Sequence, residues 1–175
     1  KTVAVTCTSN PHSLFVNVTG LVGTGLVLQN NLADNLLIKS NGVSGFAAKV
    51  PSGQDYAVTV LGQPSTPNQT CTVSSAVGTV ANVDVTLNVS CVSNNYTIGG
   101  TVLGYVGSGL VLLNNGGNPL SISATGVFAF TTPTAGGSAY AVTVGTQPSG
   151  FTCGVSYGTG VVGDGNVTSV VVNCP

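Results

Sequence analysis

The chain has 175 residues, and its charged side chains are only three lysines and four aspartates, with a formal net charge of −1. Charged residues make up 4% of the sequence, against roughly 25% in ordinary globular proteins. Binding to nucleic acid requires many positive charges that attract phosphate groups. With three lysines and no arginine, the chain is not expected to bind nucleic acid. No apolar run approaches the ~20 residues that span a bilayer, so we expect no membrane insertion.

The composition favours an all-β fold. The apolar residues are largely Val, Ala and Leu, interrupted by Thr, Ser, Asn and 25 glycines. β-Branched residues suit pleated strands, while Gly and Asn suit the turns between them. Strong helix formers such as Glu, Arg and Met are absent, so little helix is expected.

The first predicted strand is KTVAVTC, residues 1–7, in which apolar and polar residues alternate. This alternation indicates a strand with one buried face. The same kind of ending, TLNVSC and VVVNC, precedes Cys91 and Cys174. We therefore expect residues 1–7 to be the last strand of a preceding repeat, or a strand donated to a neighbouring molecule. Cys7 would then be unpaired within this chain or bonded to another one.

An internal repeat follows. GLVGTGLVLQNN at residues 20–31 returns as GYVGSGLVLLNN at residues 104–115. YAVTVLGQPS at residues 56–65 returns as YAVTVGTQPS at residues 140–149. Both pairs are separated by 84 residues, so the two copies align without a gap over this region. Such self-similarity is typical of tandem modules.

The aligned copies define two predicted domains. Residues 7–65 match residues 91–149 at 27 of 59 positions, which indicates duplication. Within each copy the apolar residues recur with the period of two expected of strands. We predict two tandem β-sandwich domains, residues 8–91 and 92–175, each with about seven short strands.

Five cysteines allow fifteen ways of forming two bonds and leaving one thiol free. The symmetry of the repeat selects one of them: Cys71 with Cys91 and Cys153 with Cys174, separated by 19 and 20 intervening residues, with Cys7 left over. Disulfides would indicate an oxidising compartment. The alternative is that all five cysteines are reduced and buried as small apolar residues.

The sequence contains no catalytic motif that we recognise. We interpret His12 as a solvated histidine, and Asp34, Asp55, Asp84 and Asp164 are scattered along the chain. They form neither a paired carboxylate motif nor a calcium loop. With one histidine and no close pair of cysteines, metal binding is not expected. We therefore predict a protein that is not an enzyme and that carries no cofactor or metal.

Tyrosines are the remaining candidates for ligand binding. Tyr96, Tyr105 and Tyr157 are expected to be exposed and could stack on sugars. Tyr56 and Tyr140 recur in phase with apolar residues and are expected to be core residues. We interpret the recurring G-x-G-L-V-L-x-N-N segment as a bend, a strand and a turn rather than as a binding loop.

The second copy resembles known β-sandwich repeats. Residues 109–144 run from a V-x-L strand through a polar turn and G-x-F-x-F to Y-x-V-x-V, although the first copy has Ser44 where the second has Phe128. This pattern is similar to that of prealbumin-like, carboxypeptidase-regulatory and collagen-adhesin B-type repeats. The whole repeat looks like the tandem modules of large bacterial surface and secreted proteins. The resemblance implies Ig-like or prealbumin-like sandwiches that act as stalks or adhesive segments.

Some surface modules of this kind contain an internal Lys–Asn isopeptide bond. Here Lys39 and Lys49 align with Ser123 and Pro133, so no lysine recurs between the copies. We expect the disulfides to take the place of such bonds.

The leading functional hypothesis is an extracellular structural or adhesive segment at the cell surface, built of disulfide-bonded sandwiches. A first alternative is the subunit of a filament, pilus or surface layer that polymerises through terminal strands. A second is a carbohydrate-binding accessory module. The partners expected are other copies of the repeat or of the chain, a host-surface or matrix protein, or a glycan.

Overall fold

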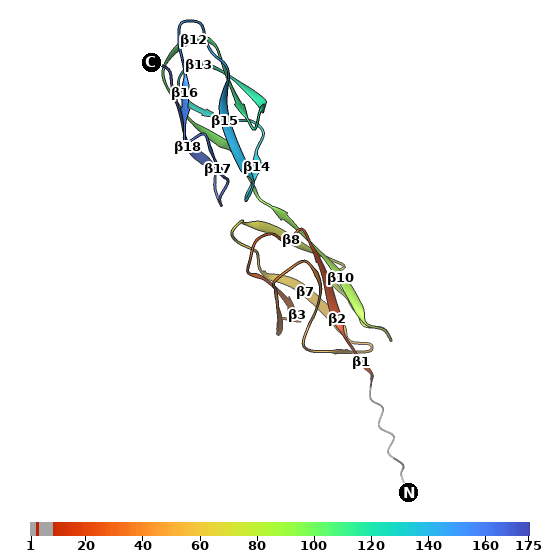
Figure 1. Ribbon diagram of the computed structural model, residues 1–175. Coiled ribbons are helices and arrows are strands. Elements are labelled where there is room, and N and C mark those ends of the chain that lie inside the picture. Colours follow the sequence, from red (N-terminus) through yellow and green to blue (C-terminus); the bar gives the residue numbers. More distant parts are fainter. Residues whose placement is uncertain (1–2, 4–8) are drawn as a thin grey trace. The chain divides into compact units, whose positions relative to one another are not determined.

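The computed structural model describes residue 3 and residues 9–175 (Figure 1). The chain divides into two compact units, Lys1–Val92 and Ser93–Pro175, called unit 1 and unit 2 below. All the regular structure in the described residues is β-strand, which confirms the predicted all-β fold. Within this part of the chain, no helix has the length and hydrophobicity needed to cross a lipid bilayer.

Unit 1 contains two four-stranded sheets that enclose one core. The strand orders are β5-β2-β10-β8 and β4-β3-β7-β9, and a short pair, β1 and β6, lies beside them. The strands are β1 (Pro11–His12), β2 (Leu14–Thr19), β3 (Leu26–Asn30), β4 (Asp34–Ile38), β5 (Gly42–Gly45), β6 (Val50–Pro51), β7 (Asp55–Gly62), β8 (Gln69–Ser74), β9 (Val77–Thr79) and β10 (Val85–Ser93). Buried side chains from both sheets form a single apolar cluster, as in a sandwich.

Unit 2 repeats this plan with longer strands. Its main sheet has the order β16-β18-β12-β15-β17, with β13 paired to β12, and β11 pairs with β14. The strands are β11 (Asn95–Tyr96), β12 (Ile98–Asn114), β13 (Gly117–Ala129), β14 (Thr134–Ala135), β15 (Ala139–Thr146), β16 (Gly154–Ser156), β17 (Thr159–Val161) and β18 (Val167–Asn173). These elements also enclose one core of buried side chains.

The expectation of short strands throughout was wrong for β12 and β13. β12 spans 17 residues and covers the positions that β2 and β3 occupy separately in unit 1. The register between β12 and β13 shifts on either side of Val106, which pairs with Ala124. Pairing therefore continues through the bend in unit 2, because irregular pairing can turn a strand without ending it.

The first long strand of unit 1 lies parallel to its last strand. β2 and β10 pair over six residues, from Leu14 opposite Val85 to Thr19 opposite Ser90. The two strands lie side by side in Figure 1. The segment that ends unit 1 is therefore held in the middle of a sheet by the segment that begins it.

Unit 2 also pairs its first long strand with its last strand in parallel, but with one irregularity in register. The first part of β12 lies parallel to β18, and the register shifts between Ile98, opposite Val167, and Gly100, opposite Val170. β18 thus contributes one more residue than β12 in this interval, as in a β-bulge. This residue accounts for the one-residue difference in spacing between the two pairs of cysteines.

Buried and exposed side chains alternate along β10, but the alternation does not extend to the residues before the strand. Leu87, Val89 and Cys91 are buried, as their spacing predicts. Val83 continues the same alternation in the sequence, which predicts that it shares this face, but it is 65% exposed. The reason is that β10 begins at Val85, so the backbone before it does not follow the pleat of the strand.

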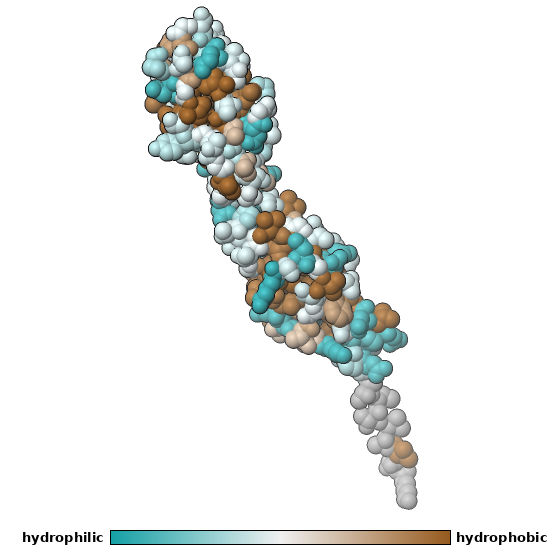
Figure 2. Space-filling view, in the orientation of Figure 1, coloured by the Kyte–Doolittle hydropathy of each residue, from teal (hydrophilic) through white to brown (hydrophobic). Residues whose placement is uncertain are grey.

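The predicted strand at residues 1–7 and the unpaired or intermolecular state of Cys7 lie outside the described residues. Val3 alone is described there, and its side chain is 83% exposed. In the rest of the chain, apolar side chains also reach the surface among polar ones, as Figure 2 shows for the visible face of each unit. Exposed apolar residues scattered in this way are common on soluble proteins.

One glycine in each unit lies against the end of the last strand. Gly20 has a φ of +75° and Gly104 a φ of +73°. A methyl group added at Gly20 would collide with the carbonyl oxygen of Cys91, and one added at Gly104 with that of Cys174. These glycines allow the chain leaving the first strand to pass close to the disulfide-bonded end of the last strand.

We predict that Gly20→Ala destabilises unit 1 more than Gly25→Ala. Both positions have a positive φ, but an added Cβ at Gly25 meets nothing within 4 Å. Gly25→Ala should therefore cost only the left-handed backbone strain of about 1–2 kcal/mol. Gly20→Ala carries this strain and must also displace the Cys91 carbonyl. Urea unfolding of the two variants tests this, and equal losses of stability would contradict it.

Candidate functional site

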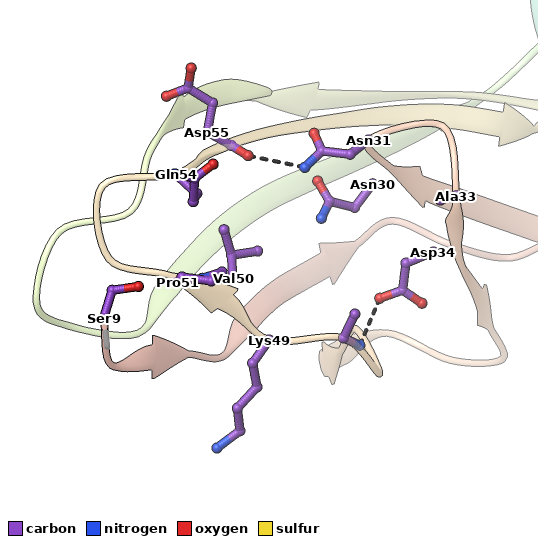
Figure 3. Close-up of a pocket in the computed structure, with 11 residues that line it drawn as sticks. Ser9, Asn30, Asn31, Ala33, Asp34, Lys49, Val50, Pro51, Gln54 and Asp55 are labelled. Carbon is purple, nitrogen blue, oxygen red and sulfur yellow. Dashed lines mark hydrogen bonds between the residues drawn. The ribbon is translucent and has the colours of Figure 1, made fainter. Parts of the chain in front are cut away.

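An open pocket in unit 1 brings together three charged residues, Asp34, Lys49 and Asp55. It has a volume of about 490 Å³ and is bordered by the ends of β3 and β6 and the start of β7 (Figure 3). Its polar lining residues are Ser9, Asn30, Asn31, Asp34, Lys49, Gln54 and Asp55. Two of the four aspartates therefore line one hollow, although 21 positions separate them in the sequence.

Both carboxylates in this pocket already have structural partners. Asp34 Oδ2 accepts a hydrogen bond of 2.8 Å from the backbone N–H of Ala48. Asp55 Oδ1 accepts one of 2.6 Å from the hydroxyl of Thr79. Figure 3 shows the Lys49 side chain pointing away from Asn30 and both aspartates. No group of three potential metal ligands occurs in the described chain.

The charges of the pocket are not repeated in unit 2. The positions equivalent to Asp34, Lys49, Gln54 and Asp55 are Asn118, Pro133, Ser138 and Ala139. Asn118 keeps the structural contact, because its Oδ1 lies 3.2 Å from the hydroxyl of Thr132, at the position equivalent to Ala48. The recurring feature of this region is therefore a link between neighbouring segments and not a set of charges.

His12 is more buried than predicted. Its side chain is 19% exposed, and Nδ1 lies 3.6 Å from Asp84 Oδ1. Nε2 is buried and has no hydrogen-bond partner among the described residues. The expectation of a solvated histidine was thus wrong, because β1 pairs His12 with Val50 at the margin of the core. The remaining aspartate, Asp164, lies in unit 2, away from this pair in the sequence.

Asp84 also has a structural role that unit 2 performs without charge. Asp84 Oδ1 accepts a 2.8 Å hydrogen bond from the backbone N–H of Ser13. In unit 2, Asn166 Oδ1 accepts the equivalent bond of 3.0 Å from Thr97. Since an amide replaces the carboxylate, the contact requires a hydrogen-bond acceptor and not a negative charge.

The division of the tyrosines into buried and exposed residues differs from the prediction. Tyr56 and Tyr140 are buried in their cores, as predicted. Tyr105 was expected at the surface but is fully buried, and Tyr96 packs partly buried against the core of unit 2. Only Tyr157 of the three proposed sugar-stacking residues is well exposed, at 74%.

Tyr105 is buried because it has an aromatic partner. Its ring meets that of Phe151 edge-on, with centroids 5.6 Å apart, a favourable arrangement for two aromatic rings. In unit 1 the bend between β2 and β3 is held differently: Gln69 Oε1 accepts 2.8 Å hydrogen bonds from the backbone N–H groups of Val22 and Gly23. Because the two arrangements use different residue types, the sequence does not predict that they occupy equivalent places in the two units.

The Asn-Asn turns prove to be structural, which supports the interpretation of the recurring segment as scaffold. Asn30 and Asn114 are buried. Their side-chain oxygens accept 3.2 Å hydrogen bonds from the backbone N–H groups of Ala57 and Ala141, respectively. Each bond joins the end of one strand to the neighbouring strand of the same sheet.

The second asparagine of each turn completes the link. Asn31 has a φ of +47° and Asn115 a φ of +53°, a conformation that Asn tolerates better than most residues. Asn31 Nδ2 donates to the carbonyl of Asp55 at 3.0 Å. Asn115 Nδ2 donates to that of Ala139 at 3.2 Å.

Disulfide bonds join Cys71 to Cys91 and Cys153 to Cys174. All four cysteines are buried. Closing a loop of 20 residues restricts the unfolded chain and contributes about 3 kcal/mol in the chain-entropy account. The first bond joins the end of β10 to the neighbouring strand β8, and the second joins the residue after β18 to the residue before its neighbour β16.

A glutamine from the repeated Q-P-S sequence holds the first cysteine of each disulfide. Gln63 Oε1 accepts a 2.7 Å bond from the N–H of Cys71, and Nε2 donates a 3.1 Å bond to its carbonyl. Gln147 makes the same two contacts with Cys153, at 2.8 and 2.9 Å. The repeated motif thus positions the cysteine backbone.

A further pair of equivalent contacts could not be predicted from the repeat, because different residue types make them in the two units. Asn41 binds both backbone groups of Leu21: Oδ1 accepts from N–H at 2.8 Å and Nδ2 donates to the carbonyl at 2.9 Å. Thr125 stands 84 positions later, and its hydroxyl makes both contacts with Tyr105 at 2.9 Å. An amide and a hydroxyl therefore perform the same task.

Comparison with known proteins identifies a fold but no family. No family model and no curated protein matches this sequence. Among solved structures, the chain is similar to the Bacillus anthracis TIE protein, with a TM-score of 0.58 and 13% identity. The match covers 94% of this chain and 34% of that one, so the chain spans about a third of its length. At this identity the likeness shows the fold alone, and it agrees with the β-sandwich modules that the sequence resembles.

Two pilins are also matched, at lower similarity. The shaft pilin SpaA of Lactobacillus rhamnosus GG gives a TM-score of 0.34 and 10% identity, covering 94% of this chain and 98% of the pilin. A major pilin of Streptococcus pyogenes gives a TM-score of 0.29 and 9% identity, covering 96% and 97%. The conclusion that the chain is composed of β-sandwich units rests on its own sheets and cores and on the match to the TIE protein.

We predict that Asn41→Ala lowers the free energy of unfolding of unit 1 by about 1–2 kcal/mol, because two backbone groups of Leu21 lose their partner. Asn41→Thr should cost less, since unit 2 shows that a threonine hydroxyl can make both contacts. Thermal and urea denaturation of the two variants give the comparison. A threonine variant as unstable as the alanine variant would contradict this account.

Proposed function

We propose that this chain is a non-enzymatic structural segment of an extracellular protein, in which disulfide-bonded sandwiches act as spacers of a stalk. The observation that carries the proposal is the use of the repeated polar residues. Those at the Asn-Asn turns and in the Q-P-S sequences bind backbone groups within their own unit. The charged residues of the pocket, in contrast, are not repeated.

Two buried disulfides support the extracellular setting, because such bonds persist mainly in oxidising compartments. The low charge of the chain fits this setting as well. Surface Asn, Ser and Thr give solubility without charge, and the resemblance to repeats of bacterial surface proteins is consistent with a stalk. We further propose residues 8–91 and 92–175 as the repeating domains.

The rival proposal is a subunit that assembles with copies of itself. The specific observation in its favour is that β4, β5, β8 and β9 lie at the edges of the sheets in unit 1. Unpaired edges can accept a strand from another chain. The carbohydrate-binding alternative retains only Tyr157 as an exposed aromatic residue from the predicted set, so we rank it below the other two.

Electron microscopy and light scattering of the purified chain distinguish the proposal from its rival. Free thiols should be alkylated beforehand so that no new disulfide links the molecules. The proposal predicts discrete monomers over a wide range of protein concentration, because each unit encloses its own core. Uniform fibres, or growth of particle mass with concentration, would contradict the stalk and support self-assembly.

A further inference from the structure

We propose that each unit is a mechanical clamp that resists force applied through its two chain ends. The clamp is the parallel pairing of the first long strand with the last strand, β2 with β10 in unit 1 and β12 with β18 in unit 2. The inference goes beyond the proposed function and does not depend on it, because it follows from strand direction alone.

Strand direction determines how force reaches the ladder. In unit 1 the chain enters β2 at Leu14 and leaves β10 beyond Ser90. Because the strands are parallel, these two points lie at opposite ends of the ladder. Tension between them pulls the strands along their length in opposite directions. All six residue pairs then carry the force together, and none can open before the others.

Further contacts extend the clamp at the point of chain entry in unit 1. The backbone N–H of Val85 donates a 3.0 Å hydrogen bond to the carbonyl of Ser13. The N–H of Ser13 in turn donates to Asp84 Oδ1 at 2.8 Å. The residue just before β2 is thus fixed to the start of β10 on both of its polar backbone groups.

Unit 2 has the same extension with different side chains. Val167 N–H donates to the carbonyl of Thr97 at 2.9 Å, and Thr97 N–H donates to Asn166 Oδ1 at 3.0 Å. At the opposite end, Cys174 N–H donates to the carbonyl of Leu103 at 3.0 Å. Five residue pairs lie between these ends. Repetition of the extension in both units shows that it is a regular part of this closure.

The disulfide of unit 1 limits what can happen once the clamp opens. β10 lies between β2 and β8 in its sheet. The bond from Cys91 to Cys71 ties the end of β10 to β8 covalently. The non-covalent boundary that must fail under tension is therefore the one between β2 and β10. Residues 72–90 lie inside the disulfide loop and cannot extend.

Two pulling directions on the same fold test the clamp. One force-spectroscopy handle is the amino end of the chain, and the other is an azide-bearing residue at position 92 or at position 83. Val92 and Val83 are both 65% exposed, and an azide handle leaves the disulfides intact. Val92 follows the far end of the ladder, whereas Val83 precedes its near end.

We expect the unfolding force to be several-fold higher with the handle at position 92 than at position 83. The handle at position 92 loads all the pairs in shear, while the handle at position 83 opens them one after another from a single end. Equal forces in the two directions would overturn the clamp. A lower force at position 92 would overturn it as well. In either case the proposed function would still stand if electron microscopy shows discrete monomers.

Reduction supplies a second readout in the same experiment. With the handle at position 92, reducing Cys71–Cys91 should lengthen the unfolded segment by about 70 Å, from a separation of 20 residues at ~3.6 Å each. In the oxidised chain, Asp84→Asn should keep the unfolding force, because Asn166 makes this contact in unit 2. Asp84→Ala should lower it. If Asp84→Ala leaves the unfolding force unchanged, Asp84 is not part of the clamp. If reduction leaves the length of the unfolded segment unchanged, the disulfide does not keep residues 72–90 from extending.

Discussion

The pairing of the first strand with the last is the constraint on which each unit depends. A sheet in which β2 and β10 are central neighbours keeps the first long strand and the last strand of the unit inside one hydrogen-bonded layer. The buried residues of both strands then face the second sheet, where Leu14, Val16 and Val18 meet the core. The disulfide adds a covalent tie on the other side of β10.

The two units show which features of the closure are chemically necessary. Asp84 and Asn166 make one contact with different acceptors, and Asn41 and Thr125 make another with different groups. The bend is held by an amide in unit 1 and by an aromatic pair in unit 2. None of these roles requires charge in both units. Unit 2 therefore makes each of these contacts with neutral side chains, through hydrogen bonds or apolar packing.

Local periodicity was enough to predict strands, the buried Tyr56 and Tyr140, and the structural character of the Asn-Asn turns. It failed where burial depends on segments distant in sequence. Tyr105 is buried because Phe151, 46 positions away, packs against it. Val83 is exposed because β10 begins two residues later. Alternation along one segment contains no information about either fact.

The candidate site was harder to predict for the same reason. Asp34 and Asp55 meet at one pocket because β3 pairs with both β4 and β7, a long-range arrangement that spacing does not reveal. The repeat did provide one usable signal. Polar residues found at the same position in both copies, such as Gln63 and Gln147, turn out to hold the backbone. Residues that differ, such as Asn41 and Thr125, escaped this signal.

Residue-resolved hydrogen exchange of the oxidised protein tests the central pairing most directly. The amide hydrogens of β2 and β10 that bond across their shared ladder should exchange only through unfolding of the whole unit, and so be among the slowest. Those on the outer sides of the edge strands β4 and β9 should exchange much faster. If the β2 and β10 amides exchange as fast as those edge amides, the first and last strands do not close the unit, and the account is wrong.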